Sequence, residues 1–397
     1  MRSKWMSVAA ALLALSAVTA AEDKGTHFAA DAVNPYIESG ECPGAISILS
    51  KPGAQEIACL GWANVEKKIP MSLDRTFMQC SQTKGFCGVT IAMLVEEGRI
   101  SLDDPVAKYL PEFKTLIIAG KDDKGNPTRT PAKNVLTIRM VMNHTGGFPF
   151  EIPSKVEKGW SSLSLRDTAR EAAANPIFFE PGTKMRYSNT GIDIGAAIIE
   201  VVTGKPWEVF LKERVLDPLG MKDTTFQPTD EQLSRAISMY DVHSGKPATF
   251  RAYNKWMPPP HNGPTVFPSA GAGLWTTAAD QLKFYKMLMN LGVGDNGVRI
   301  LKEDTVKNLL ATSTRPAELG EYSLGLGVNR KLGTMGHGGA WKTNCQVNWK
   351  NKELRLWVVQ QNGKATPWVK KWRAAADKFF ATKGGDDASD AYTGRLN

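Results

Sequence analysis

Several features that define other classes of protein are missing from this 397-residue chain. It has no Cys-x-x-Cys pair and its five histidines lie far apart, so we expect no metal site. Gly-x-Ser-x-Gly is absent, which excludes the nucleophile elbow of α/β-hydrolases. Gly325-x-Gly327 lacks a following helix pattern, so we expect no nucleotide and no other cofactor. The formal net charge is +9, but dense basic runs are absent, and we expect no nucleic-acid partner.

Long hydrophobic runs are also absent. The apolar run 8–18 is too short to span a bilayer, follows Arg2 and Lys4, and precedes the small residues 18–20. This pattern predicts a cleaved signal peptide over residues 1–20 and export to the periplasm or the medium. We expect no stable membrane insertion after cleavage, and no cysteine lies near the cleavage site to carry a lipid anchor.

The chain has five cysteines, which is an odd number, so at least one thiol stays unpaired unless it bonds another chain. Export permits disulfides. Cys42 and Cys59 are the favoured pair because two candidate strands carry them, although sequence alone does not fix connectivity.

The order of predicted elements indicates two lobes. Apolar runs 45–49 and 56–62 flank Lys51-Pro52-Gly53 and predict a hairpin. Helical periodicity starts at Ser81 and stops at Gly98, and it returns over 192–202, 205–216, 277–291 and 368–380. Thr277 is the expected N-cap of the helix over 277–291. Strand patterns cover 322–328, 345–349 and 354–360, and 120–134 is a polar surface segment.

The fold class is therefore α/β (α+β). We expect one domain over 21–383, with an α/β lobe from about 26–78 and 270–383 and a helical lobe over about 79–269. The tail 384–397 is predicted to be disordered.

The first chemical motif is Ser81-Gln82-Thr83-Lys84. Ser81 is the only serine followed by lysine at the third position. Residues i and i+3 share a helix face, so the two side chains can meet. Lysine acts as a base only where burial disfavours the ammonium form. Alone, the motif is equally consistent with a helix N-cap followed by a solvated lysine.

The second and third motifs are Tyr187-Ser188-Asn189 and His337-Gly338-Gly339-Ala340. Tyr187, as a tyrosinate or by shuttling a proton with Lys84, can deprotonate Ser81. Asn189 can bond Lys84 or a substrate carbonyl. The glycines allow close approach to a strand, and the amides of Ala340 and Ser81 can form an oxyanion hole.

These motifs resemble those of the serine β-lactamase and penicillin-binding-protein superfamily, most closely class C β-lactamases and their esterase relatives. The resemblance runs from about Pro43 to Gln361. Supporting stretches are Leu136-Thr137-Ile138-Arg139 through His144-Thr145-Gly146-Gly147, Asp217-Pro218-Leu219-Gly220-Met221, and Ala270-Gly271-Ala272-Gly273-Leu274 with the following Thr276, Thr277, Ala278 and Asp280.

The resemblance implies an antiparallel sheet flanked by helices, with an inserted, mainly helical lobe. It implies that Ser81 is the acylated nucleophile, Lys84 its proton-accepting partner and Tyr187 the catalytic tyrosine. Asn189, His337, Gly338, Gly339 and Ala340 match substrate-binding positions. His337 departs from class C β-lactamases, which carry lysine there. Histidine is largely neutral at pH 7, so this position lacks the positive charge that faces the carboxylate of a β-lactam. Lys342 is close in sequence but is not assumed to replace that lysine.

The favoured function is an exported serine hydrolase that opens a small ester, amide or peptide through an acyl-enzyme on Ser81. Carboxylesterase ranks first, D-amino-acid peptidase or amidase second, and β-lactamase third. The alternative from another class is a catalytically silent protein that binds cell-wall fragments. Trp160, Trp256, Trp275 and Trp341 are candidates for the wall of an acyl pocket, although core packing is the more frequent role of tryptophan.

Overall fold

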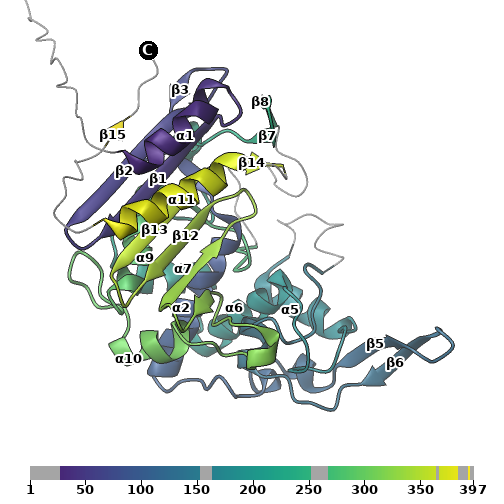
Figure 1. The fold of residues 1–397 in the computed structure, drawn as a ribbon. Coiled ribbons are helices and arrows are strands. Elements are labelled where there is room, and N and C mark those ends of the chain that lie inside the picture. Colours follow the sequence, from purple (N-terminus) through teal and green to yellow (C-terminus); the bar gives the residue numbers. More distant parts are fainter. Residues whose placement is uncertain (1–26, 153–162, 252–266, 364–365, 383–391, 394–397) are drawn as a thin grey trace, which may run out of the picture.

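The computed structural model describes residues 27–152, 163–251, 267–363, 366–382 and 392–393. Its centre is a sheet in the order β10-β11-β12-β13-β1-β2-β15, with β3 paired to β2 (Figure 1). The strands are β1 (Gly44–Lys51), β2 (Ala54–Asn64), β3 (Ile69–Pro70), β10 (Gly327–Asn329), β11 (Thr334–Gly338), β12 (Asn344–Asn348), β13 (Glu353–Val358) and β15 (Tyr392–Thr393). Strands from both ends of the chain thus share one sheet, as predicted. The predicted signal peptide and, apart from β15, the predicted tail lie outside the described residues.

The N-terminal hairpin is confirmed. β1 and β2 pair antiparallel, with Ile46 opposite Cys59 and Ser50 opposite Gln55. The turn between them contains Gly53 at φ 77°, a left-handed conformation that glycine adopts without a steric penalty. The prediction succeeded because Pro-Gly turn chemistry and two apolar runs agreed on one structure.

Helices cover both faces of the sheet. α1 (Phe28–Glu38) packs beside α11 (Pro367–Ala381) on one face, where Trp372 donates from Nε1 to Ser47 Oγ at 2.8 Å (Figure 1). α9 (Ala278–Met289) packs against β12 and β13, and Thr277 caps it by accepting from the Asp280 backbone N–H. The helix over 368–380 and the Thr277 cap are therefore confirmed, whereas α1 was not predicted.

This two-sided packing contradicts the favoured disulfide. Cys42 packs with the apolar residues under α1 and α11, whereas Cys59 belongs to the hydrophobic cluster on the opposite side of the sheet. All five cysteines lie among the described residues, and each is buried and free. Two side chains on opposite faces of one sheet cannot be bridged without moving the backbone.

The helical part centres on α2 (Thr83–Glu96), which is buried along most of its length. α6 (Asn189–Thr203) contacts α2 and is capped by Ser188, whose Oγ accepts from the Gly191 N–H. Other elements around this pair are α3 (Ile138–Met142), α5 (Leu165–Ala174), α7 (Trp207–Leu211), a π-helical turn (Lys212–Leu216), α8 (Asp230–Ser234) and α10 (Glu303–Thr305). The predicted helix over 205–216 is thus split between α7 and the π-helical turn.

Two further predictions are corrected in part. Of the expected strand 322–328, only the end forms β10, because Gly325 turns away at φ 73° to lie against the backbone of Lys84. The surface segment 120–134 is exposed, but it forms part of a projecting hairpin of β5 (Ile117–Lys121) and β6 (Pro127–Pro131) (Figure 1). A smaller pairing joins β4 (Thr76–Met78) to β9 (Trp275–Thr277). In another small sheet, β7 (Tyr240–His243) lies between β14 (Gln361–Asn362) and β8 (Lys246–Phe250).

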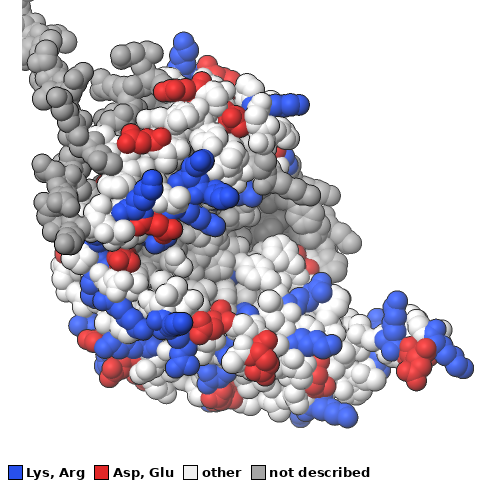
Figure 2. Space-filling model, in the orientation of Figure 1, with Lys and Arg blue, Asp and Glu red and all other residues white. Residues whose placement is uncertain are grey.

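The charged residues on the visible face are of both signs. Figure 2 shows Lys and Arg interspersed with Asp and Glu over this face. The projecting hairpin has the same mixture near its tip, with Lys121 and Lys124 beside Asp122 and Asp123.

Candidate active site

Ser81 and Lys84 meet at the start of α2. Ser81 lies in a 3₁₀ turn (Cys80–Gln82), and Lys84 lies in the first turn of the helix that follows. Lys84 Nζ is 3.2 Å from Ser81 Oγ. The contact expected from the i, i+3 spacing is therefore present.

Lys84 is fully buried and has two further oxygen partners. Nζ donates to Asn189 Oδ1 at 2.5 Å and to the Gly271 carbonyl oxygen at 2.7 Å. Both partners only accept hydrogen bonds. In the amine form, the two N–H bonds serve these oxygens and the nitrogen lone pair is left to face Ser81. In the ammonium form, the third N–H points at Ser81 instead.

Neighbouring residues hold this arrangement in place. Asn189 Nδ2 donates to Glu151 Oε1 at 2.6 Å, which fixes Oδ1 toward Lys84. Gly271 lies so close to Asn189 that a Cβ there would come within 2.6 Å of the Asn189 Cβ. Gly271 belongs to the Ala270–Leu274 stretch, whose glycines thus permit a backbone carbonyl to reach the lysine.

Tyr187 lies against the same lysine. Lys84 Nζ is 4.6 Å from the centroid of the Tyr187 ring. Burial raises the pKa of Tyr187 to about 12, against the lowering effect of a hydrogen bond with Ser81. Tyr187 is therefore a neutral phenol near pH 7, which disfavours the interpretation of Tyr187 as a resting tyrosinate.

β11 passes directly beside the 3₁₀ turn that carries Ser81. His337 and Gly338 end the strand, and Gly339 and Ala340 follow it. A Cβ on Gly339 would lie 2.6 Å from the Gln79 carbonyl oxygen, so only glycine allows this approach. The sequence patterns identified a glycine-rich edge here but placed the strand after it, so β11 itself was missed. The assignment of Ala340 to an oxyanion hole stays a prediction.

Cys80, the residue before Ser81, has an unusual backbone. Its φ is 51°, a region that residues with a Cβ rarely occupy and that costs on the order of 1–3 kcal/mol. Burial raises the pKa of the Cys80 thiol to about 12, although the nearby N–H groups of Trp341 and Ala340 lower it. The thiol is thus neutral, and the strained backbone presents Ser81 at the end of a turn.

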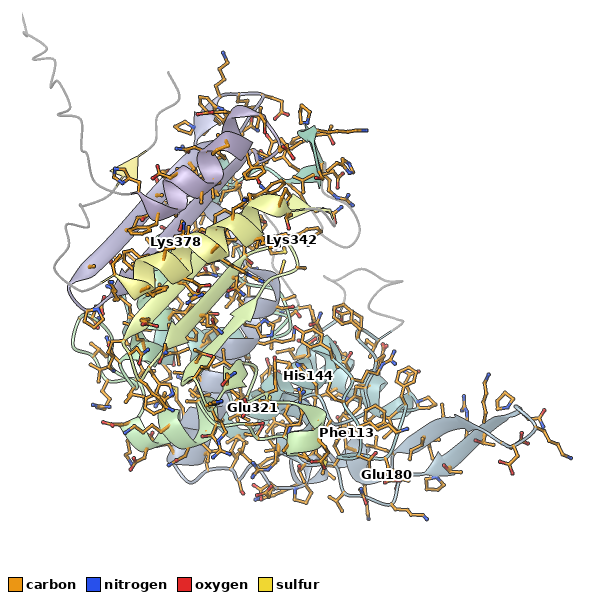
Figure 3. The ribbon with its side chains drawn as sticks, viewed as in Figure 1. Phe113, His144, Glu180, Glu321, Lys342 and Lys378 are labelled. Carbon is orange, nitrogen blue, oxygen red and sulfur yellow. The ribbon has the colours of Figure 1, made fainter. Side chains whose placement is uncertain are left out.

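His337 supplies no positive charge near neutral pH. Burial, with a smaller contribution from Lys84, lowers its pKa to about 4. Lys342 follows in the β11–β12 loop, and Figure 3 shows it well separated from His144. The expectation that His337 is neutral near pH 7 therefore agrees with its lowered pKa.

Several residues near the site were not singled out from sequence. His144 is buried between the rings of Tyr187 and Tyr322, at centroid distances of 4.4 and 4.7 Å (Figure 3). Tyr322 lies 3.0 Å from His337 Nε2, and Arg315 stacks on Tyr322 at 5.0 Å. His144 lies in one of the family-like stretches, which was a usable signal. No local sequence motif marks Tyr322, Arg315 or Glu151, so only the folded structure shows that they lie near the site.

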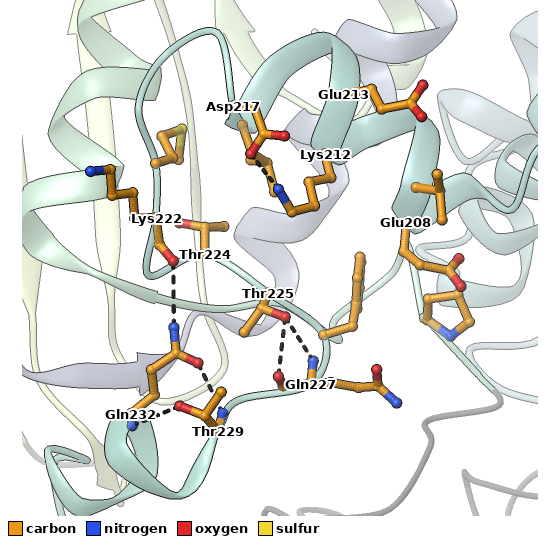
Figure 4. A pocket seen from close by; sticks show the side chains of 15 residues that line it. Glu208, Lys212, Glu213, Asp217, Lys222, Thr224, Thr225, Gln227, Thr229 and Gln232 are labelled. Atoms are coloured by element: carbon orange, nitrogen blue, oxygen red, sulfur yellow. Dashed lines mark hydrogen bonds and ion pairs between the residues drawn. The ribbon is translucent and has the colours of Figure 1, made fainter.

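The structure contains two cavities whose linings can be compared with the predicted site residues. One, of about 350 Å³, is bordered by Tyr322, His337 and Gly338. The other, of about 640 Å³, lies between α7, the π-helical turn and residues 221–232, and Figure 4 shows its lining. In it Lys212 pairs with Asp217, and none of the predicted site residues lines it. Of the four tryptophans considered for an acyl pocket, Trp275 is buried in β9 and Trp341 half-buried, while Trp160 and Trp256 lie outside the described residues.

The family assignment rests on comparison with known proteins. The model of the Beta-lactamase family matches residues 29–379, and the chain belongs to that family. Protein Rv1367c of Mycobacterium tuberculosis is 30% identical over 284 residues, which are 69% of this chain and 69% of that protein.

Solved structures confirm the β-lactamase/transpeptidase-like fold. EstCE1, a hydrolase with promiscuous acyltransferase activity, is 21% identical, with 88% of this chain and 97% of that chain covered and a TM-score of 0.71. Simvastatin synthase (LovD) from Aspergillus terreus is 18% identical, with 89% and 98% covered and a TM-score of 0.73. The resemblance inferred from the motifs is thus correct for family and fold. In the described residues, no helix has the length and apolar character needed to cross a membrane.

Proposed function

We propose that this protein is a serine carboxylesterase that cleaves small, uncharged esters through an acyl-enzyme on Ser81. The observation that carries the proposal is the 3.2 Å contact between Lys84 Nζ and Ser81 Oγ inside a cage of two carbonyl oxygens. The similar fold of EstCE1, a hydrolase with promiscuous acyltransferase activity, supports a hydrolytic reaction that passes through an acyl-enzyme.

The reaction follows from the hydrogen-bond directions. Ser81 Oγ attacks the ester carbonyl carbon while its proton passes to Lys84 Nζ, whose lone pair faces it in the amine form. The carbon–alkoxide bond then breaks. Tyr187 donates its phenolic proton to the departing oxygen and regains one from Lys84, whose nitrogen lies 4.6 Å from the ring centroid. Water cleaves the acyl-enzyme by the reverse proton path and releases the acid.

The neutral state of His337 supports an uncharged ester as the substrate rather than an anionic β-lactam. A lysine at this place would attract a carboxylate, whereas an imidazole whose pKa is lowered to about 4 offers only hydrogen bonds. Peptides and amides have poorer leaving groups than esters and remain the second candidate.

A panel of three chromogenic substrates tests the proposal. We expect hydrolysis of a p-nitrophenyl ester of a short acid with kcat/KM at least about tenfold above that of a cephalosporin, since the loss of one attractive charge contact is worth about tenfold. A D-amino-acid anilide should also react more slowly than the ester, because its leaving group is poorer. Ser81→Ala, measured beside the wild type, must remove the ester activity. A cephalosporin turned over faster than the ester would replace this proposal with a β-lactamase.

We also propose that the enzyme is exported after removal of residues 1–20. Support comes from the basic, apolar and small-residue segments at the N-terminus. The intact mass of protein purified from a bacterial host's periplasm or medium should correspond to a chain that starts near Ala21. Full-length protein confined to the cytosol would contradict export.

A further inference from the structure

Two phenol groups approach the same nitrogen of His337. The Tyr322 hydroxyl lies 3.0 Å from Nε2, and the Tyr187 hydroxyl lies 3.5 Å from it. Both tyrosine rings pack against His144. The His144 imidazole thus contacts both tyrosine rings, and both hydroxyls approach the His337 imidazole.

The other nitrogen of His337 determines where its proton sits. Nδ1 is 2.6 Å from the Gly338 carbonyl oxygen, and a carbonyl oxygen only accepts, so Nδ1 carries the hydrogen. In the neutral ring Nε2 then has one lone pair and can accept one strong hydrogen bond. The shorter distance makes Tyr322 the donor, since 3.5 Å is at the outer limit for a hydroxyl.

We propose that Tyr322 is a positioning residue for the catalytic tyrosine: it occupies the lone pair of His337 and so leaves the Tyr187 hydroxyl available to Ser81 and the leaving group. This proposal rests on the proposed esterase function, because it assigns a role in the same reaction. Without Tyr322, the Tyr187 hydroxyl is the nearest phenol able to donate to Nε2, and that bond would turn its proton away from the substrate.

Burial and packing suit Tyr322 to this role. Its side chain is buried, and burial raises its pKa well above the ordinary value, so it stays a donor across the working pH range. Arg315 stacks on its ring at 5.0 Å and bonds the Asn143 carbonyl oxygen through Nε and Nη2. The tyrosine ring is therefore in contact with both Arg315 and His144.

A bond from Tyr322 to Nε2 also affects the protonation of His337. It stabilises the neutral ring and adds to the effects of burial and of Lys84, which lower the pKa. The titratable and charged groups that surround His337 come from several elements: Lys84 on α2, His144 after α3, Tyr187 before α6, Tyr285 on α9, Arg315 and Tyr322 before β10, and Cys345 on β12. The tyrosines and Cys345 have raised pKa values, so among these groups only His144 also changes charge toward acid pH.

The test is Tyr322→Phe, which keeps the ring and removes the hydroxyl. Nitrogen NMR of the imidazoles, assigned with His337→Gln, should show that the pKa of His337 rises by about one unit from its value near 4, the size of one hydrogen bond. With a p-nitrophenyl ester, kcat should fall about tenfold while KM stays constant, and the acid limb of kcat should move up by the same pH interval.

Tyr240→Phe is the matched control. The Tyr240 hydroxyl is also hydrogen-bonded, to Glu66 at 2.7 Å, but it lies on β7 outside the site. This variant should leave the His337 titration and the acid limb unchanged. An unchanged pKa of His337 in Tyr322→Phe, or a wild-type ring protonated on Nε2 instead of Nδ1, would overturn the proposal. Because the NMR result needs no turnover, it decides on Tyr322 even if the wild type proves to hydrolyse no ester.

Discussion

Replacement of Lys84 by methionine is expected to lower kcat/KM for a p-nitrophenyl ester by at least about 10²-fold, the usual scale for loss of a general base. Methionine fills a similar volume but offers no nitrogen to Ser81 Oγ, which lies 3.2 Å from Nζ in the native site. The proton of Ser81 then has no nearby acceptor, because Tyr187 is a neutral phenol whose pKa is raised to about 12. The loss should appear mainly in kcat, and stopped-flow measurement of the nitrophenolate burst should place it in acylation.

Lys283→Met is the control for a lost lysine. Lys283 pairs with Asp280 at 2.9 Å and donates to the Gly220 carbonyl oxygen, so it too bonds one side chain and one backbone oxygen. Lys283 lies outside the site, so the Lys283→Met variant should retain full activity. Thermal melting of both variants separates misfolding from loss of catalysis, and wild-type acylation by a folded Lys84→Met variant would remove Lys84 from the mechanism.

Replacement of Tyr187 by phenylalanine should also slow acylation by an alkyl ester by about 10²-fold or more. The ring stays in contact with His144 and Lys84, so the site keeps its packing and loses only the proton donor to the leaving group. The defect should grow with the basicity of the leaving alcohol, because p-nitrophenolate departs unaided and an alkoxide does not. We therefore expect a small effect on a p-nitrophenyl ester relative to the matching ethyl ester, measured by product titration.

Tyr109→Phe serves as its control. Its hydroxyl donates to Asp104 at 2.6 Å on the helical side, away from Ser81. Equal losses on both esters in Tyr187→Phe would show that Tyr187 does not protonate the leaving group, and its role would then be limited to orienting Ser81.

Sequence patterns succeeded where one local signal decided the structure. The Pro-Gly turn gave the β1–β2 hairpin, and the i, i+3 spacing placed Lys84 beside Ser81. Thr277 was recognised as a cap because an N-cap side chain bonds the backbone only three residues away. The family followed from motifs that span the chain.

The remainder depended on contacts between distant segments. The cage around Lys84 needs Gly271, which is 187 residues away in the chain. The role of Tyr322 depends on its contact with His337 on β11. Gly325 interrupts the expected strand because it packs against the backbone of Lys84. The disulfide prediction failed for the same reason, since Cys42 packs under α1 and α11 while Cys59 packs in the core on the other side of the sheet. No pattern within one segment reports such packing.

Labelling with a fluorophosphonate tests the central claim, an activated Ser81, most directly. Ser81 Oγ should attack phosphorus and expel fluoride, giving a single adduct in the intact mass that peptide mapping places on Ser81. Ser81→Ala should gain none. A wild-type protein that forms no adduct, or one that carries it on another residue, would contradict the account and bring forward a protein that binds cell-wall fragments without catalysis.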